Sequence, residues 1–204
     1  MSNETIELGL RERKKRAARI AIQLKALELV AERGFCHVSV DDIAAAAGVS
    51  PRTFFNYYAT KEDALFTPDI DRLEAADRVI AQADASRGPM SVVRETLLDM
   101  MDQSRYDLSA VRLRQKILDR EPTLVGSFLR VSRSTQACWV SALNERFAAD
   151  KAMPEGYIDL VVAVAWTAAG VALHLWSVGG EDELFLDVLT RQLDQVSAGL
   201  DDPL

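Results

Sequence analysis

Apolar residues recur at intervals of three and four along most of this chain of 204 residues, and that spacing predicts helices. A polar lead-in, residues 1–10, is expected to be poorly ordered. The apolar face of the first helix, predicted at residues 11–33, consists of Ile20, Leu24, Leu27 and Ala31. Loops containing Gly, Pro or Asp separate later helices, predicted at residues 61 to about 83, 90–106, 108–120, 123–148, 154–178 and 182–200. No segment alternates like a strand, so the predicted fold is all-α with about nine helices.

Residues 38–65 predict two short helices joined by a tight turn. Ser39 is a good N-cap, and Asp42 stands at the reciprocal capping-box position three residues later. Gly48 stands where the chain must leave the first short helix, since glycine adopts the left-handed conformation without steric cost. Ser50 caps the next helix and Pro51 suits its first position, so a second helix is predicted at residues 51–57.

The second short helix leaves a set of donors, acceptors and rings outside the small core that the helices share. Such residue types contact base edges and phosphates in DNA grooves. The predicted DNA-binding residues on this helix are Arg52, Thr53, Phe55, Asn56 and Tyr57. The alternative interpretation is an ordinary solvated helix pair in a helical bundle.

The segment from about Arg19 to Leu65 resembles the DNA-binding domain of the TetR family of one-component repressors. The matching motifs are Ala31 to Phe35, Ser39 to Ala44, Ala47 to Ser50, Thr53 to Phe55, Tyr57-Tyr58 and Thr60 to Leu65. The resemblance implies an N-terminal arm and helix-turn-helix domain at residues 1–66, followed by a larger helical effector-binding and dimerisation domain at residues 67–204. It also implies that Lys61 contacts a DNA phosphate, with Tyr57 as a second backbone contact. Ser39 can add a third from its hydroxyl and the neighbouring N–H groups.

The charge distribution qualifies this picture. A net charge of −7 and a pI near 4.9 argue against nucleic acid as the partner. Between Arg11 and Arg19, however, six basic residues accompany the single acid Glu12, and a basic arm beside a DNA-binding helix is suited to phosphate. A solvated, charged helix start is the alternative.

An enzyme is the rival class. The sequence has no zinc-binding helix motif, Cys-x-x-Cys, phosphate loop or Gly-x-Ser-x-Gly elbow, so no catalytic residue, metal or cofactor is expected. Cys36 and Cys138 are predicted to be buried thiols, with a redox-sensing pair as the alternative. His37 falls in a loop and His174 among apolar neighbours. The N-terminus lacks an apolar segment for secretion, and a cytoplasmic location is expected.

Residues 158–176 are apolar on every side of the predicted helix. A helix of this kind is buried all round, and in so small a chain we expect one side to face a second copy. The apolar stripe of the last helix is expected to join this homodimer interface. A membrane span is the competing interpretation, but Thr167 and His174 interrupt the run and no basic flank accompanies it.

The expected function is a dimeric repressor that binds a palindromic operator in double-stranded DNA and is released by a small apolar or amphipathic effector. The run from Arg112 to Trp139 resembles the effector domains of some actinobacterial members of the family. The predicted ligand-binding residues are Met100, Met101, Arg105, Arg112, Trp139, Trp166 and His174, each with ordinary core as its alternative. The alternative functions are a DNA-binding regulator without a small-molecule inducer and, more remotely, a helical enzyme.

Pro68 interrupts what would otherwise be one connecting helix. Proline lacks the N–H donor and crowds the carbonyl of Ala64, so a break with a restart at Asp69 is predicted, with Thr67 in extended geometry. The functional hypothesis is a hinge that transmits effector binding to the DNA-binding residues, and the alternative is a static kink.

Overall fold

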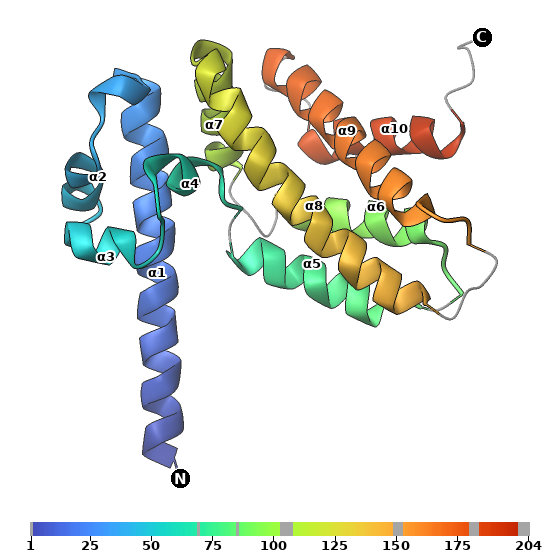
Figure 1. Cartoon of the computed structure of the whole chain (residues 1–204), viewed down its shortest axis with the longest axis horizontal. Helices are drawn as coiled ribbons and strands as arrows, with labels where there is room; N and C mark the ends of the chain where they lie inside the picture. The colour runs from blue at the N-terminus through green and yellow to red at the C-terminus, as the bar shows by residue number, and fades with distance from the viewer. Residues whose placement is uncertain are drawn as a thin grey trace. The chain divides into compact units, whose positions relative to one another are not determined.

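The computed structural model describes residues 2–68, 70–84, 86–102, 108–148, 153–179 and 184–199, with side chains from Arg11 onward (Figure 1). These ranges contain ten α-helices, two 3-10 helices and no strand, which confirms the all-α prediction. The α-helices are α1 (Ser2–Arg33), α2 (Val40–Ala46), α3 (Pro51–Phe55), α4 (Lys61–Phe66), α5 (Ile70–Gln82), α6 (Pro89–Met100), α7 (Ser109–Arg120), α8 (Val125–Phe147), α9 (Tyr157–Val178) and α10 (Phe185–Ser197). The 3-10 helices are η1 (Phe35–His37) and η2 (Pro122–Leu124).

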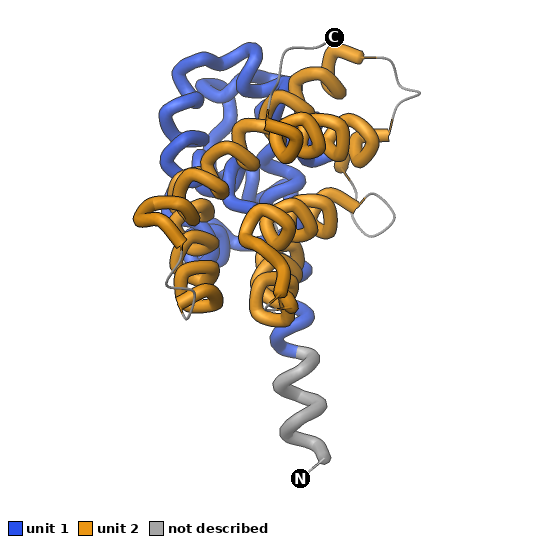
Figure 2. The backbone as a smooth tube through the Cα atoms, turned by 90° about the vertical axis from the view of Figure 1, so that its right-hand side faces the viewer, with its two compact units in different colours: residues 1–70, 109–131 blue, residues 71–108, 132–204 orange. Residues whose placement is uncertain are grey.

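The chain forms two compact units, and the first is discontinuous in sequence (Figure 2). Unit 1 comprises residues 1–70 and 109–131, and unit 2 comprises residues 71–108 and 132–204. The predicted domain boundary after residue 66 lies near the first of these divisions. The predicted second domain, however, includes residues 109–131, which here belong to the unit that contains the helix-turn-helix.

Helix α1 begins at Ser2, nine residues before the predicted start at Arg11, and the poor order expected of residues 1–10 stays a prediction. Its buried face consists of Ile22, Ala26 and Val30, spaced four residues apart, together with Leu27 and Ala31. Ile20, predicted on that face, is 38% exposed. Ile20 precedes Ile22 by two positions, which places it about 200° around the helix from that side chain.

The core of unit 1 joins these α1 residues to Ile43 of α2, Phe54 of α3 and Leu65 of α4. Helix α7 adds Ile117 to the same core, which is why residues 109–131 associate with this unit. At the start of α8, the ring of Phe128 lies edge-on to that of Phe66, with 5.8 Å between centroids.

Unit 2 packs α6 and α10 against α9. Within it, the ring of Trp139 meets that of Trp166 edge-on at 5.2 Å, and Trp176 lies 5.2 Å from Phe185. Four apolar residues of the α10 stripe are buried inside the unit: Phe185, Val188, Leu189 and Leu193. These four residues therefore belong to the subunit's own core, and participation of the rest of α10 in a dimer interface stays a prediction.

Helix α9 is buried on one side only. Residues such as Val162, Ala165 and Trp176 face the core, whereas the large apolar side chains Leu160, Val171, Leu175 and Val178 are exposed. Among the described residues, α9 is the one helix long and apolar enough to cross a membrane. The prediction that this helix is buried all round does not hold within one chain.

The connection between α4 and α5 breaks at the predicted place. Helix α4 ends at Phe66, Thr67 is extended (φ −61°, ψ 127°), and α5 starts at Ile70. Asp69, the predicted restart, lies outside the described residues. Proline therefore divides this segment into two helices, and the hinge role of Pro68 stays a prediction.

Three further expectations concern helix ends and cysteines. Helix α6 ends at Met100 rather than at residue 106, and α10 ends at Ser197 rather than at residue 200; both predicted ends lie outside the described residues. Cys36 and Cys138 are both exposed, so the prediction of buried thiols was wrong. Cys36 belongs to η1, where no residue is buried, and Cys138 lies on the solvent side of α8.

Candidate nucleic-acid interface

Helix α2 begins with a complete capping box. The Ser39 hydroxyl accepts a hydrogen bond from the Asp42 N–H (3.1 Å), and the Asp42 carboxylate accepts one from the Ser39 N–H (2.9 Å). That carboxylate also accepts from the Ser39 hydroxyl at 2.5 Å. The hydroxyl bond and the backbone bond lower the pKa of Asp42. The predicted capping box is confirmed, and it presents the exposed start of α2 with Ser39 at its tip.

The turn after α2 depends on Gly48, whose φ of +67° lies in the left-handed region. The Val49 N–H donates to the Ala44 carbonyl at 2.9 Å and closes the end of α2. The chain then enters α3 through Ser50, whose hydroxyl accepts from the Thr53 N–H at 3.1 Å. Pro51 occupies the first turn as predicted.

Helix α3 ends at Phe55, two residues before the predicted end at Tyr57. Asn56 is its C-cap, and Tyr58 then turns into the core, where it is 3% exposed. The Tyr58 hydroxyl donates to the Arg19 carbonyl at 3.3 Å, and the Arg19 guanidinium lies 5.6 Å from the ring. The burial of Tyr58 agrees with its predicted place in the domain core.

The predicted DNA-binding residues of α3 lie on one short surface. Arg52 and Asn56 are exposed, and Phe55 is 57% exposed. Thr53 and Tyr57 are half-buried. The Thr53 hydroxyl is 2.8 Å from that of Ser50, which holds it at a defined place on the helix start. The arrangement presents a cation, an amide, a hydroxyl and two rings beside each other, which are groups that read base edges and phosphates.

Lys61, at the first turn of α4, holds the loop that follows α1. Its ammonium donates to the carbonyls of Phe35 (2.8 Å) and Val38 (2.7 Å). It also lies 4.0 Å from the centroid of the Phe35 ring, where a cation is attracted to the π face. Two of its three N–H donors are therefore engaged within unit 1, a positioning role that the sequence did not suggest.

Glu121 holds the same residue, Phe35, by its N–H group. Its carboxylate accepts a hydrogen bond from the Phe35 N–H at 3.1 Å. The preceding Gly34 has φ 87° and ψ 153°, a conformation essentially confined to glycine. A Cβ at Gly34 would meet the Glu121 carboxylate at 3.3 Å. The loop between α1 and α2 is thus shaped by contacts from both α4 and the α7–η2 corner.

Arginines of α7 and α8 bind elsewhere in unit 1. Arg114 donates to the Leu65 carbonyl at 2.7 Å, and Arg120 donates to the Ala31 carbonyl at 3.2 Å. Arg130 donates to the Asp63 carboxylate at 2.9 Å. Burial raises the pKa of Asp63, but the hydrogen bonds from Arg130 and Thr60 outweigh that effect and lower it. These contacts tie α7 and the start of α8 to helices α1 and α4.

The predicted ligand-binding residues do not form a single cluster in the described structure. Trp139 and Met100 are buried in the core of unit 2, Met101 and Trp166 are half-buried, and His174 is exposed. Arg112 is exposed on α7 and belongs to unit 1, and Arg105 lies outside the described residues.

A hollow of about 540 Å³ in unit 2 lies elsewhere, on α6 and α10, where Arg94 forms an ion pair with Asp194 at 2.9 Å. In the described ranges, no three His, Cys, Asp or Glu side chains are grouped to hold a metal ion.

A capped helix-turn-helix with an exposed polar second helix defines a class, that of DNA-binding regulators. The sequence model described as the TetR family of bacterial regulatory proteins matches residues 24–66. The chain is 30% identical over 178 residues to a protein named as the mycofactocin biosynthesis transcriptional regulator MftR of Mycobacterium tuberculosis, which covers 86% of this chain and 87% of that protein. It is 32% identical over 189 residues to the helix-turn-helix regulator TcmR of Streptomyces glaucescens, with 86% and 80% covered. The chain belongs to the TetR family.

Solved structures show the same fold. NalD, the secondary repressor of the MexAB-OprM efflux pump in Pseudomonas aeruginosa, matches with a TM-score of 0.58 and 18% identity, over 91% of this chain and 96% of that one. The Thermus thermophilus repressor FadR, solved with lauroyl-CoA, matches with a TM-score of 0.55 and 20% identity over the same shares. Both extend over nearly the whole chain, beyond the helix-turn-helix.

Proposed function

We propose that this chain is a transcriptional repressor that binds a palindromic operator as a homodimer in the cytoplasm and is released by a small apolar or amphipathic effector. The observation that carries the DNA-binding part is the exposed α3 surface, held by caps at Ser39, Ser50 and Thr60. Family membership supports it. The FadR structure with lauroyl-CoA, an amphipathic molecule, supports an effector of that chemistry.

The exposed face of α9 supports the homodimer. Leu160, Val171 and Val178 are 60%, 44% and 69% exposed and lie along one stripe of the helix. Two polar side chains on α9, Thr167 and Ser177, donate to carbonyls of their own helix at 2.9 and 2.8 Å. Their hydroxyl protons are therefore already hydrogen-bonded and need no partner from water or from another chain. A second copy covers such a stripe, and two-fold symmetry then places two helix-turn-helix units on two half-sites.

One observation favours the second candidate, a regulator without a small-molecule inducer. Two residues predicted to line the effector pocket, Trp139 and Met100, are 1% and 3% exposed and are packed as ordinary core. A thermal-shift screen with acyl thioesters, fatty acids and flat aromatic compounds distinguishes the two candidates. Stabilisation that also lowers operator affinity supports the inducer, and stabilisation by none of these classes supports the alternative.

Operator binding is tested with duplexes from the region upstream of the protein's own gene. Thr53→Ala and Asn56→Ala are each expected to reduce discrimination against substituted operators by about 1–3 kcal/mol, because each side chain is assigned to base edges. Fluorescence anisotropy with a set of single-base variants measures this. The control is Asn144→Ala, an exposed asparagine of α8, which should leave base preference unchanged. Equal effects in control and test variants would remove the base-reading assignment.

Lys61→Ala is expected to have two effects. Loss of a charged donor to two carbonyls should lower the free energy of unfolding by about 1–3 kcal/mol. Loss of the proposed phosphate contact through the remaining N–H should weaken binding to all duplexes alike and reduce the salt slope by about one unit.

The control for Lys61 is Lys116→Ala, an exposed lysine on α7 of the same unit. Chemical denaturation and salt titration separate the two effects. A destabilised Lys61→Ala with an unchanged salt slope would assign Lys61 to positioning alone, and a changed base preference with an unchanged slope would contradict the role given to it.

A further inference from the structure

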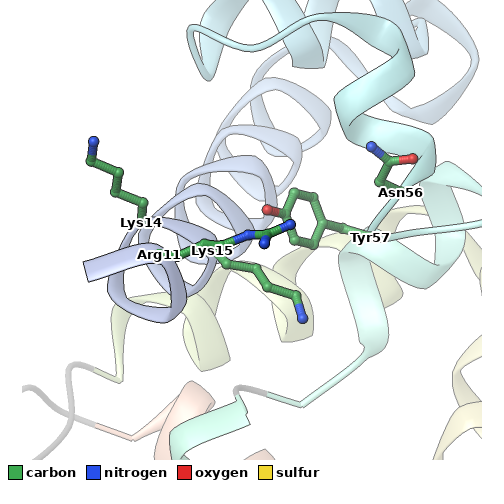
Figure 3. A pocket seen from close by; sticks show the side chains of 5 residues that line it. All are labelled: Arg11, Lys14, Lys15, Asn56 and Tyr57. Carbon is green, nitrogen blue, oxygen red and sulfur yellow. The ribbon is translucent and has the colours of Figure 1, made fainter. Parts of the chain in front are cut away.

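An open hollow of about 350 Å³ lies between the N-terminal part of α1 and the end of α3. Arg11, Lys14 and Lys15 line it from α1, and Asn56 and Tyr57 line it from the turn after α3 (Figure 3). In Figure 3, the Tyr57 ring extends toward α1, and Arg11 and Lys15 extend from α1 in the direction of that ring. All five belong to unit 1, so two segments that are more than forty residues apart in sequence form one surface.

The chemistry of this lining suits an anion. Among the side chains that the structure describes, the hollow is lined by three cations, an amide and a phenol, and by no carboxylate. Arg11, Lys14 and Lys15 occupy positions i, i+3 and i+4, which share one helix face. The described acid in contact with them is Glu12, 3.8 Å from Lys15, and both side chains of this pair are more than half exposed. Such a pair contributes little and exchanges readily for a stronger anion.

We propose that this hollow binds backbone phosphates of the operator DNA, so that the N-terminal turns of α1 form part of the DNA interface together with the end of α3. The proposal rests on the DNA-binding function proposed above. It adds Arg11, Lys14 and Lys15 as contacts to the DNA backbone, and it assigns Tyr57 to the same phosphate site as these residues of α1.

The openness of the hollow distinguishes DNA from a free anion. Arg11, Lys14, Lys15 and Asn56 are exposed, so a small anion would meet these charges in nearly bulk water, where attraction between single charges is weak. When Lys or Arg side chains bind a polyanion such as DNA, they displace its condensed counterions. The release of these counterions favours binding even at an exposed site. The hollow also adjoins Asn56, one of the proposed base-reading residues, which places it beside the duplex.

The test compares two triple variants that remove the same charge. The first is Arg11→Gln/Lys14→Gln/Lys15→Gln. The control is Arg78→Gln/Lys116→Gln/Arg133→Gln, which neutralises three exposed cations outside α1 that do not line the hollow. Operator and unrelated duplexes are titrated by fluorescence anisotropy across a series of salt concentrations, after circular dichroism has verified folding.

The first variant should lose at least about tenfold in affinity for both duplexes, and its salt slope should fall by about 2.7 units, since three phosphate contacts are lost and each accounts for about 0.9. The control should lose about threefold or less. Tyr57→Phe should weaken binding in the parent and have no further effect in the first variant, because both act on the same phosphates.

Equal losses in the two triple variants, or additive effects of Tyr57→Phe, would overturn the proposal. Thermal stabilisation of the DNA-free parent by inorganic phosphate that is lost in the first variant would assign the hollow to a free anion instead. A parent protein that binds no duplex at all would refute the proposed function, and this inference with it.

Discussion

Val171→Glu should convert the protein from a dimer to a monomer. Val171 lies in the exposed apolar stripe of α9 and is 44% exposed in the single chain, so the substitution should not disturb the subunit's own core. In a two-fold interface it places two carboxylates against apolar surface, and the effective desolvation penalty is several kcal/mol per ion. A loss of about 4 kcal/mol raises the dissociation constant of the dimer about a thousandfold.

Operator affinity should fall with the dimer. Binding through two linked half-site contacts increases operator affinity about 10²–10⁴-fold over binding through one, and a monomer loses that increase. Light scattering at micromolar concentration and anisotropy with the full operator measure the two effects. Gln82→Glu, at the exposed end of α5, adds the same charge to unit 2 and should change neither. A Val171→Glu protein that remains dimeric would exclude this face as the interface, and a parent that is already monomeric would exclude the dimer itself.

Phe54→Ala should unfold unit 1 at a markedly lower temperature than the parent. The Phe54 side chain is fully buried, edge-on to Phe55 at 5.5 Å and 5.9 Å from Tyr58. Truncation of a buried phenylalanine costs about 3–5 kcal/mol, a large part of the roughly 5–15 kcal/mol that stabilises a domain. The melting midpoint of this unit should fall by on the order of 15 °C or more.

The protein contains its own probes for this experiment. All three tryptophans, Trp139, Trp166 and Trp176, belong to unit 2. Tryptophan fluorescence therefore reports on unit 2, whereas far-ultraviolet circular dichroism reports on helices of both units. In the Phe54→Ala variant, the unfolding midpoint measured by circular dichroism should fall, whereas the midpoint measured by tryptophan fluorescence should fall much less.

The neighbouring Phe55 provides a matched control. It is 57% exposed, and Phe55→Ala should cost about 1 kcal/mol, mainly through the edge contact with Phe54. Equal destabilisation by the two substitutions would contradict the packing of α3 described here. A shift of equal size in dichroism and fluorescence would mean that the two units unfold as one.

The helix-turn-helix was predictable from the sequence because its signals are local. Ser39, Ser50 and Thr60 each bond an N–H three residues ahead, and Gly48 has the positive φ that its place after α2 requires. Each of these contacts lies within a few residues of its cause, so the residue types alone indicated it. The break at Pro68 was predictable for the same reason.

Contacts between distant segments left no comparable signal. The Phe35 N–H and its acceptor Glu121 are 86 residues apart, and nothing in the neighbourhood of either residue identifies the other. The contacts of Lys61 with the Phe35 and Val38 carbonyls, and the burial of Ile117 in unit 1, are of the same kind. For α9 and the effector residues, an apolar pattern shows that side chains avoid water but does not distinguish core, cavity wall and interface.

The discontinuous unit 1 has a consequence for recombination between relatives. A chimera joined once, near residue 67, would pair the helix-turn-helix of one parent with residues 109–131 of the other. In such a chimera, the residues that contact α1, α4 and the Phe35 loop would come from a different protein than those elements do. These residues are Ile117, Arg114 and Glu121. A functional transplant of operator specificity therefore needs three crossovers, so that residues 109–131 travel with residues 1–70.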